Sequence, residues 1–191
     1  YAARFRARIV AFAAALPDLP TAEREALTGT AAKSLFRLMA YKDEYEVARL
    51  MTASRFRDKL AADWDGGRVV YHLAPPFLPA RKDARGRPAK RSFGAWLTPM
   101  LRVLARAKAL RGTAFDPFGW MAERREGRAL ITWFDSVLTQ LPGQITQSGS
   151  DVALEILAAP QQMRGYGPVK QAAIADHQAK ADAALAAMID S

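Results

Sequence analysis

Apolar residues recur along most of the chain at intervals of three and four positions, which places them on one side of an α-helix. Phe5, Ile9, Phe12 and Leu16 form the first such stripe, and Pro17 ends it. Further helices are predicted, by the same spacing or by their end signals, over residues 21–38, 43–51, 56–64, 97–107, 121–138, 151–159 and 174–188. The pattern therefore predicts a mainly α-helical protein, an irregular bundle of about seven helices.

Several of these helices carry matching signals at their ends. Thr21 follows Pro20 and precedes two glutamates, which is typical of an N-cap. Asp43 has the same role at the next helix, with Glu46 three residues on as the reciprocal acid of a capping box. Gly29 weakens the second helix and could split it, and Gly112 suits a C-terminal cap.

The stripes also predict which side chains face the core. In the helix that Asp43 begins, Val47, Leu50 and Met51 are expected to point inward. In the helix from Leu97 the inward stripe consists of Leu97, Met100, Leu101, Leu104 and Ala107. Arg102 and Arg106 lie one turn apart on a different side of that helix.

One segment has the composition of a β-strand. "RVVYHL", residues 68–73, is β-branched and aromatic, follows Asp65-Gly66-Gly67 and ends before Pro75 and Pro76. It predicts one short strand or hairpin around residues 68–74. Residues 81–91 show no periodicity and predict a basic loop, "GTAFDPFG" predicts a turn that Asp116 begins, and residues 142–150 predict a polar linker.

Composition narrows the class of protein. Half of the 191 residues are hydrophobic, enough for the core of one domain, so we expect a single helical domain over residues 1–191. No apolar run approaches the roughly 20 residues of a membrane-spanning helix, and a soluble, cytoplasmic protein is expected. The chain starts at Tyr1 inside a helical pattern, which suggests a piece of a longer polypeptide.

The net charge of +9 is concentrated in one segment. Residues 78–112 hold ten Lys and Arg against one acid, Asp83, so this segment accounts for the whole excess. Together with Phe93 and Trp96, such a basic segment suits phosphates, an anionic cofactor or an acidic protein. No helix-turn-helix, RRM or KH signature is visible, which argues against nucleic acid.

Few residues suit catalysis or metal binding. The chain has no cysteine, and its two histidines, His72 and His177, lie far apart without metal-ligand spacing. No serine lies in a GxSxG elbow, and "RGYGPVK" lacks the length and order of a phosphate-binding loop. A structural role is therefore favoured for His72, which lies on the predicted strand and faces solvent or a partner. No catalytic residue, cofactor or metal is predicted within this chain.

Six ordered stretches between residues 35 and 170 resemble one enzyme family. They are "LFRLMAYKDEYEVARL", "YHLAPPFL", "GRPAKRSFGAW", "LRGTAFDPFG", "ERR" and "RGYGPVK". In this order they resemble the C-terminal region of indolepyruvate ferredoxin oxidoreductase-like proteins, which are thiamine-diphosphate-dependent 2-oxoacid:ferredoxin oxidoreductases.

The resemblance implies a parent enzyme that oxidatively decarboxylates aryl pyruvates with coenzyme A and reduces ferredoxin. Thiamine diphosphate, Mg²⁺ and iron-sulfur clusters would lie in domains outside this chain. This segment would be an accessory domain that packs on the other domains or subunits and helps to bind coenzyme A or ferredoxin. The candidate contacts to these partners are Tyr41, Lys42, Tyr45, Arg49, His72, Arg85, Arg87, Lys90, Arg164 and Lys170.

Two other interpretations stay open at this point. A stand-alone basic helical module could bind nucleic acid, in which case its affinity would fall steeply with salt. A purely structural dimerisation domain is the third.

Overall fold

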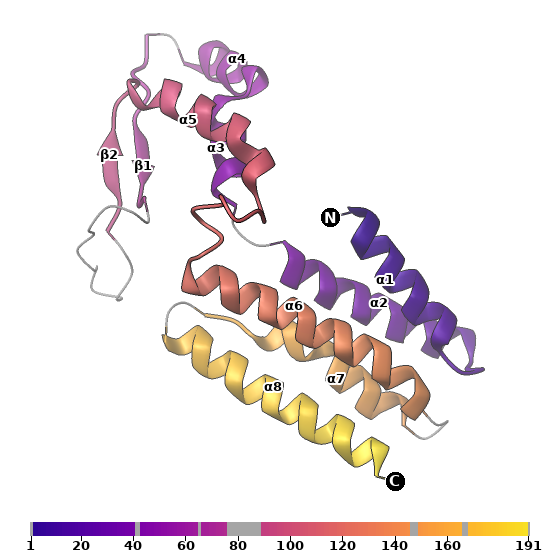
Figure 1. Ribbon diagram of the computed structural model, residues 1–191. Helices are drawn as coiled ribbons and strands as arrows, with labels where there is room; N and C mark the ends of the chain where they lie inside the picture. The colour runs from indigo at the N-terminus through magenta and orange to yellow at the C-terminus, as the bar shows by residue number, and fades with distance from the viewer. Residues whose placement is uncertain are drawn as a thin grey trace. The chain divides into compact units, whose positions relative to one another are not determined.

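The computed structural model describes residues 2–40, 43–64, 66–75, 89–145, 149–165 and 168–190. These residues form eight α-helices, two short 3-10 helices and a two-stranded antiparallel sheet (Figure 1). The mainly α-helical class with one short hairpin is thereby confirmed. In the described ranges, no helix is both long and apolar enough to cross a membrane.

The chain divides into two compact units, which we call unit 1 and unit 2. Unit 1 comprises residues 1–41 and 125–191, and unit 2 comprises residues 42–124. The single domain expected over residues 1–191 stays a prediction.

Unit 1 is a set of packed helices. Its elements are α1 (Ala2–Ala15), α2 (Thr21–Met39), α6 (Ala122–Gln140, in this unit from Arg125 onward), the 3-10 helix η2 (Leu141–Gln144), α7 (Ser150–Gln162) and α8 (Pro168–Ile189). Helix α2 packs on α1 and α7, and α7 packs on α8. Each contributes its apolar stripe, so that Leu27, Leu35, Phe134, Leu141 and Leu157 are completely buried.

Two polar contacts inside unit 1 are also buried or half-buried. Ser34 on α2 is fully buried and donates a hydrogen bond of 2.6 Å to the carbonyl oxygen of Leu157 on α7. The carboxylate of Asp135 on α6 accepts from Arg4 at 2.8 Å and from Arg8 at 3.3 Å, both on α1. These bonds connect helices that are distant in sequence.

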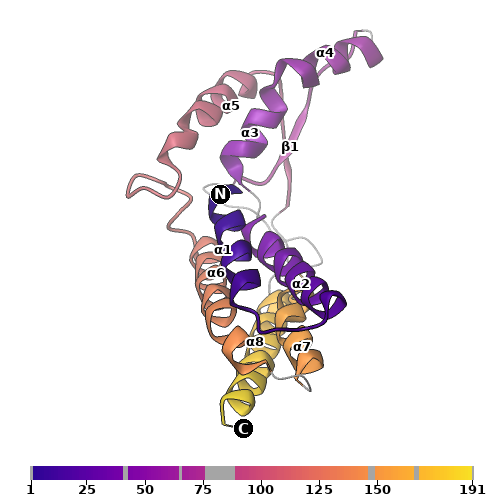
Figure 2. The same cartoon turned by 90° about the vertical axis from the view of Figure 1, so that its right-hand side faces the viewer.

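Unit 2 combines helices with the hairpin. Its elements are α3 (Glu44–Thr52), α4 (Ser54–Asp63), β1 (Tyr71–Leu73), β2 (Arg91–Phe93), α5 (Leu97–Arg106) and the 3-10 helix η1 (Ala107–Leu110). Helices α3 and α5 lie side by side (Figure 2). In the hairpin, Tyr71 pairs with Phe93 and Leu73 with Arg91.

The core of unit 2 is small. Ala48 from α3, Tyr71 from β1, and Leu97 and Leu101 from α5 form its buried cluster. The Tyr71 hydroxyl lies 2.9 Å from the hydroxyl of Thr98, which joins the hairpin to the first turn of α5.

Several core predictions for unit 2 are wrong. Val47 and Leu50 are 37% and 53% exposed, because α3 turns Tyr45 and Ala48 toward the unit instead. Met100 is 60% exposed, because only the Leu97 and Leu101 side of α5 is covered. Helix α4 buries no residue, so its stripe faces outward.

Some element boundaries also differ from the sequence predictions. Helix α2 begins at Thr21 itself, with Pro20 in the cap position and no side-chain cap, and Gly29 does not split it. The predicted polar linker at residues 142–150 instead begins in η2, where Leu141 and Pro142 are buried. The strand is shorter than "RVVYHL", and its partner β2 falls where the predicted basic loop ends.

Candidate functional site

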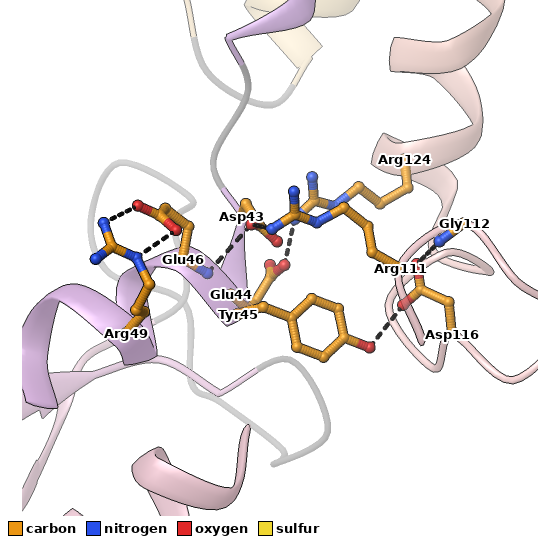
Figure 3. Close-up of polar contacts among 9 residues, drawn as sticks. All are labelled: Asp43, Glu44, Tyr45, Glu46, Arg49, Arg111, Gly112, Asp116 and Arg124. Carbon is orange, nitrogen blue, oxygen red and sulfur yellow. Dashed lines mark hydrogen bonds and ion pairs between the residues drawn. The ribbon is translucent and has the colours of Figure 1, made fainter. Parts of the chain in front are cut away.

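A group of charged and polar residues with mutual contacts surrounds the start of α3 in the described part of unit 2 (Figure 3). We call it the polar cluster and define it as Asp43, Glu44, Tyr45, Arg111, Gly112, Asp116 and Arg124. Three separate sequence stretches contribute to it, the start of α3, the turn after η1 and the first turn of α6.

Asp43 begins the cluster as the N-cap of α3. Its backbone is extended, with φ −124° and ψ 116°, and its carboxylate accepts a hydrogen bond of 3.1 Å from the amide of Glu46. This satisfies one of the amides that every helix start leaves unpaired, so the predicted cap is confirmed. The same carboxylate oxygen accepts from the guanidinium of Arg111.

Glu46, the predicted reciprocal acid of the capping box, pairs with Arg49, and the reciprocal half of the box stays a prediction. Its carboxylate accepts two hydrogen bonds from Arg49, at 2.9 and 2.6 Å. The hydrogen bond from Arg49 lowers the pKa of Glu46. Glu46 and Arg49 lie three residues apart on α3, and both side chains remain half-exposed.

Asp116 organises the turn between η1 and α6. Its Oδ2 accepts from the amide of Gly112 at 2.9 Å, and its Oδ1 accepts from the amide of Phe118 at 3.1 Å. Gly112 has φ +76°, a conformation that favours glycine. A Cβ atom on Gly119 would lie 3.1 Å from Oδ2 of Asp116. The two glycines therefore let the backbone wrap closely around one buried carboxylate.

Tyr45 connects this turn to α3. It is 2% exposed, its hydroxyl donates a hydrogen bond of 3.0 Å to Oδ1 of Asp116, and its ring packs edge-on against Phe118 with centroids 5.2 Å apart. Burial, followed by the hydrogen bond and the charge of Asp116, raises the pKa of Tyr45 to about 12. The phenol is therefore a neutral donor at physiological pH.

The pKa of Asp116 moves in the opposite direction. Burial alone would raise it, but hydrogen bonds from the amides of Gly112, Gly119 and Phe118 and from the Tyr45 hydroxyl outweigh burial and lower it. Efficient general acid–base catalysis needs a pKa near the working pH. The pKa of Tyr45 and the pKa of Asp116 both lie farther from pH 7 than their ordinary values. The pair therefore stabilises the structure and is poorly suited to proton transfer.

Glu44 and Arg124 complete the cluster with an ion pair between α3 and α6. The side chain of Arg124 is 13% exposed and that of Glu44 is 30% exposed, so water screens the pair only in part. Each of the three acids in the cluster thus has an arginine, an amide or a phenol as its partner. The arrangement can hold three chain segments in a fixed geometry.

One of the ten predicted contact residues belongs to the polar cluster. Tyr41, Lys42, Arg85 and Arg87 lie outside the described residues. Tyr45 belongs to the cluster and has its contacts inside unit 2.

The remaining predicted residues belong to both units. His72 is exposed on β1, with its Nδ1 3.1 Å from the hydroxyl of Ser92 across the hairpin, and Lys90 is exposed just before β2. Arg164 and Lys170 belong to unit 1, where both are exposed and Arg164 donates to the carbonyl oxygen of Gln161 at 2.8 Å. Their role as partner contacts stays a prediction.

Sequence reasoning missed Glu44, Arg111 and Arg124 as partners and treated Asp116 only as a turn residue. A signal was present, because "YKDEYEVARL", "LRGTAFDPFG" and "ERR" belong to the same set of ordered stretches. Their joint occurrence did not show which of their residues form pairs, and only the structure shows this.

Other features of the described chain are weaker candidates for a functional site. A shallow pocket in unit 1 lies between the first turns of α2 and α7, where Ser150 donates to Glu23 at 2.7 Å. Glu23 and Asp151 already place negative charge at both helix starts. Within the described ranges, no three His, Asp or Glu side chains are grouped so that they could hold a metal ion.

Comparisons with known proteins give one match. Neither a curated protein nor a solved structure matches the chain. The profile of one protein family matches residues 1–183, nearly the whole sequence. The chain therefore belongs to this family, which is described as a family of unknown function (DUF6537).

Proposed function

We propose that this chain is a helical accessory region of a 2-oxoacid:ferredoxin oxidoreductase of the indolepyruvate type, a cytoplasmic enzyme. The parent enzyme oxidatively decarboxylates aryl pyruvates with coenzyme A and reduces ferredoxin. Its thiamine diphosphate, Mg²⁺ and iron-sulfur clusters lie in other domains, and this region packs on those domains or on a partner subunit.

One observation carries the proposal. Three of the six stretches that resemble this enzyme family meet in the polar cluster, through Tyr45 and Asp116 and through Glu44 and Arg124. Residues 43–45, 111–116 and 124 lie far apart in sequence, so their contact supports the view that the stretches form a structural signature of one fold. The cluster fixes geometry, as an accessory region requires.

The charge of unit 2 supports a contact with an anionic partner. Residues 42–124 contain 17 Lys and Arg against 9 Asp and Glu, a net charge of +8, whereas unit 1 carries +1. Coenzyme A carries phosphates and ferredoxins are acidic, so a basic unit would raise their encounter rate at low ionic strength. We therefore assign to unit 2 a part in binding one of them.

Steady-state kinetics of the intact parent enzyme test the proposal. Arg85, Arg87 and Lys90 are changed together to glutamate, and indolepyruvate-dependent reduction of ferredoxin is measured at low and high salt. The apparent KM for ferredoxin or for coenzyme A should rise at low salt, and the difference should shrink at high salt because counterions screen the charges. The matched control changes Arg6, Lys33 and Arg37, three exposed cations of unit 1, to glutamate.

The two variants separate the outcomes. An enzyme without 2-oxoacid-dependent activity would refute the assignment of the parent. Equal kinetics in the unit 2 variant and the control would refute the role of the basic segment.

A further inference from the structure

In the described part of unit 2, more large apolar side chains are exposed than buried. In the described part of unit 1, 21 hydrophobic residues are buried and 5 large ones are exposed. In the described part of unit 2 the balance is reversed, with 6 buried and 12 exposed. Exposed apolar patches of this kind mark interaction surfaces.

Helix α5 carries the most regular of these patches. Trp96, Met100 and Val103 are 63%, 60% and 65% exposed. Their i, i+4, i+7 spacing places them on one side of the helix, beside the side that buries Leu97 and Leu101. We call this side, together with Arg102 and Arg106, the outer face of α5.

Trp96 is held in position by contacts inside unit 2. Its ring packs edge-on against Phe93 of β2, with centroids 6.0 Å apart. Gly94 leaves room for the ring, since a Cβ atom there would lie 3.4 Å from Cδ1 of Trp96. The amide of Leu97 donates to the carbonyl oxygen of Gly94 at 3.1 Å, which fixes the turn. A pre-ordered tryptophan loses little conformational entropy on binding and is a typical interface hot spot.

The charge around the stripe selects the kind of partner. Arg102 and Arg106 are both exposed, and neither forms an ion pair with another described residue. A second copy of unit 2 would bring another net charge of +8 against the first. Unit 1 carries only +1 and has already buried most of its own apolar side chains. A complementary surface is therefore acidic and belongs to a different protein or domain.

The apolar side chains favour protein over nucleic acid. Nucleic acid offers phosphates to the arginines and base faces to Trp96, but its phosphate backbone gives Met100 and Val103 no apolar surface to contact. An acidic protein surface with an apolar centre matches both parts of the face.

We propose that the outer face of α5 docks an acidic protein surface that carries an apolar groove, into which Trp96, Met100 and Val103 insert while Arg102 and Arg106 pair with carboxylates. This inference rests on the proposed function for the place of that surface in the cell, as another part of the oxidoreductase or its redox partner. The face itself follows from exposure and charge alone.

Fluorine NMR of the 191-residue chain tests the proposal. The four tryptophans are replaced by 5-fluorotryptophan, and single Trp→Phe variants assign their signals. The chain is titrated with a glutamate–tyrosine copolymer, with polyglutamate and with a DNA oligonucleotide, all of equal charge. The copolymer should shift the Trp96 signal and leave that of Trp133 in α6 unchanged, and it should bind more tightly than polyglutamate or DNA.

Two variants with matched exposure sharpen the test. Val103→Glu should weaken copolymer binding about tenfold, the effect of losing one central apolar contact. Val169→Glu, on α8 and 68% exposed, should leave it unchanged. Four outcomes would each overturn the proposal. The Trp96 signal could stay unmoved, or the two variants could have equal effects. Polyglutamate could bind as tightly as the copolymer, or DNA could bind more tightly than the copolymer at Trp96. Because neither ferredoxin nor coenzyme A is used, such a result leaves the proposed function to its own kinetic test.

Discussion

Replacing Tyr45 with phenylalanine removes one hydroxyl from the polar cluster and leaves the ring packed against Phe118. The hydroxyl donates to Oδ1 of Asp116, and Asp116 is only 6% exposed, so water cannot easily replace the lost donor. The same oxygen keeps its hydrogen bond from the Phe118 amide. A hydrogen bond to a charged group contributes about 1.5–3 kcal/mol, and the remaining donor places the expected loss at about 1.5–2 kcal/mol.

Tyr71→Phe is the matched control. It removes the same atom from a tyrosine that is 8% exposed, but the partner is the neutral hydroxyl of Thr98 at 2.9 Å. A neutral hydrogen bond contributes less, and about 0.5–1 kcal/mol is expected. The comparison isolates the charge of Asp116 as the reason for the larger effect.

Urea unfolding measured by tryptophan fluorescence suits this comparison. In a Trp133→Phe background the three remaining tryptophans all belong to unit 2, so fluorescence reports that unit alone. Both variants should lower the urea midpoint with an unchanged slope, which shows a change in stability and not in the extent of unfolding.

The pH dependence gives a second criterion. The pKa of Tyr45 is raised from 10.0 to about 12, so its contribution is fully present below pH 10 and is lost as pH rises toward 12. The pKa of Asp116 is lowered, so its contribution is present above its unfolded value of about 3.9 and is lost as pH falls through its folded value. The difference between the native chain and Tyr45→Phe should therefore be largest between about pH 5 and 10 and narrow on both sides. A loss equal to that of Tyr71→Phe, or a difference constant with pH, would refute this reasoning.

Four further substitutions test local features by the same unfolding measurement or by thermal unfolding. Asp43→Ala should destabilise unit 2 by about 1–2 kcal/mol, because the N-cap of α3 is lost and Arg111 loses its partner. Amide hydrogen exchange should rise first at the start of α3. Unchanged exchange at that helix start would contradict the prediction. Gly119→Ala should destabilise the protein, because the new Cβ atom approaches the Asp116 carboxylate. Gly127→Ala, inside α6 with open space around it, should stabilise the protein by about 0.5–1 kcal/mol. Stability changes of the same sign in the two variants would contradict these two predictions. Ser34→Ala should destabilise unit 1 by about 1 kcal/mol through its lost bond to α7, and a neutral effect would show that the bond contributes nothing.

Local periodicity predicted the helices well, because each helix needs only its own neighbours to show an apolar side. The stripes of α1, α2 and α8 are also buried as predicted, with Phe12, Leu35 and Leu185 at their centres. Periodicity predicted the buried residues of α5 less well, because the apolar side of this helix is wider than the surface that the hairpin and α3 cover. It grouped the buried Leu97 with the exposed Met100, and sequence alone cannot show which part of a wide stripe is covered.

The polar cluster could not be predicted in the same way. Tyr45 lies 71 positions from Asp116, and Glu44 lies 80 positions from Arg124. Such pairs depend on how distant segments return to one another, and no spacing within a helix encodes that. The hairpin partner β2 was missed for a related reason, since three residues next to a basic loop carry little periodicity of their own.

The division into two units has a consequence for the order of folding during synthesis. Unit 1 is discontinuous, because α2 packs on α7 while all of residues 42–124 lie between them in the chain. Helices α1 and α2 therefore leave the ribosome with Leu27 and Leu35 uncovered and must wait until α7 has been made. Unit 2 is continuous and the regions at its two ends are joined through Glu44 and Arg124, so it can fold in the meantime. Native contacts of such long sequence separation form late and leave apolar surface open to aggregation. The nascent chain thus depends on prompt completion of its C-terminal helices. A pause in translation between residues 124 and 150 would leave the apolar sides of α1 and α2 open to aggregation for longest.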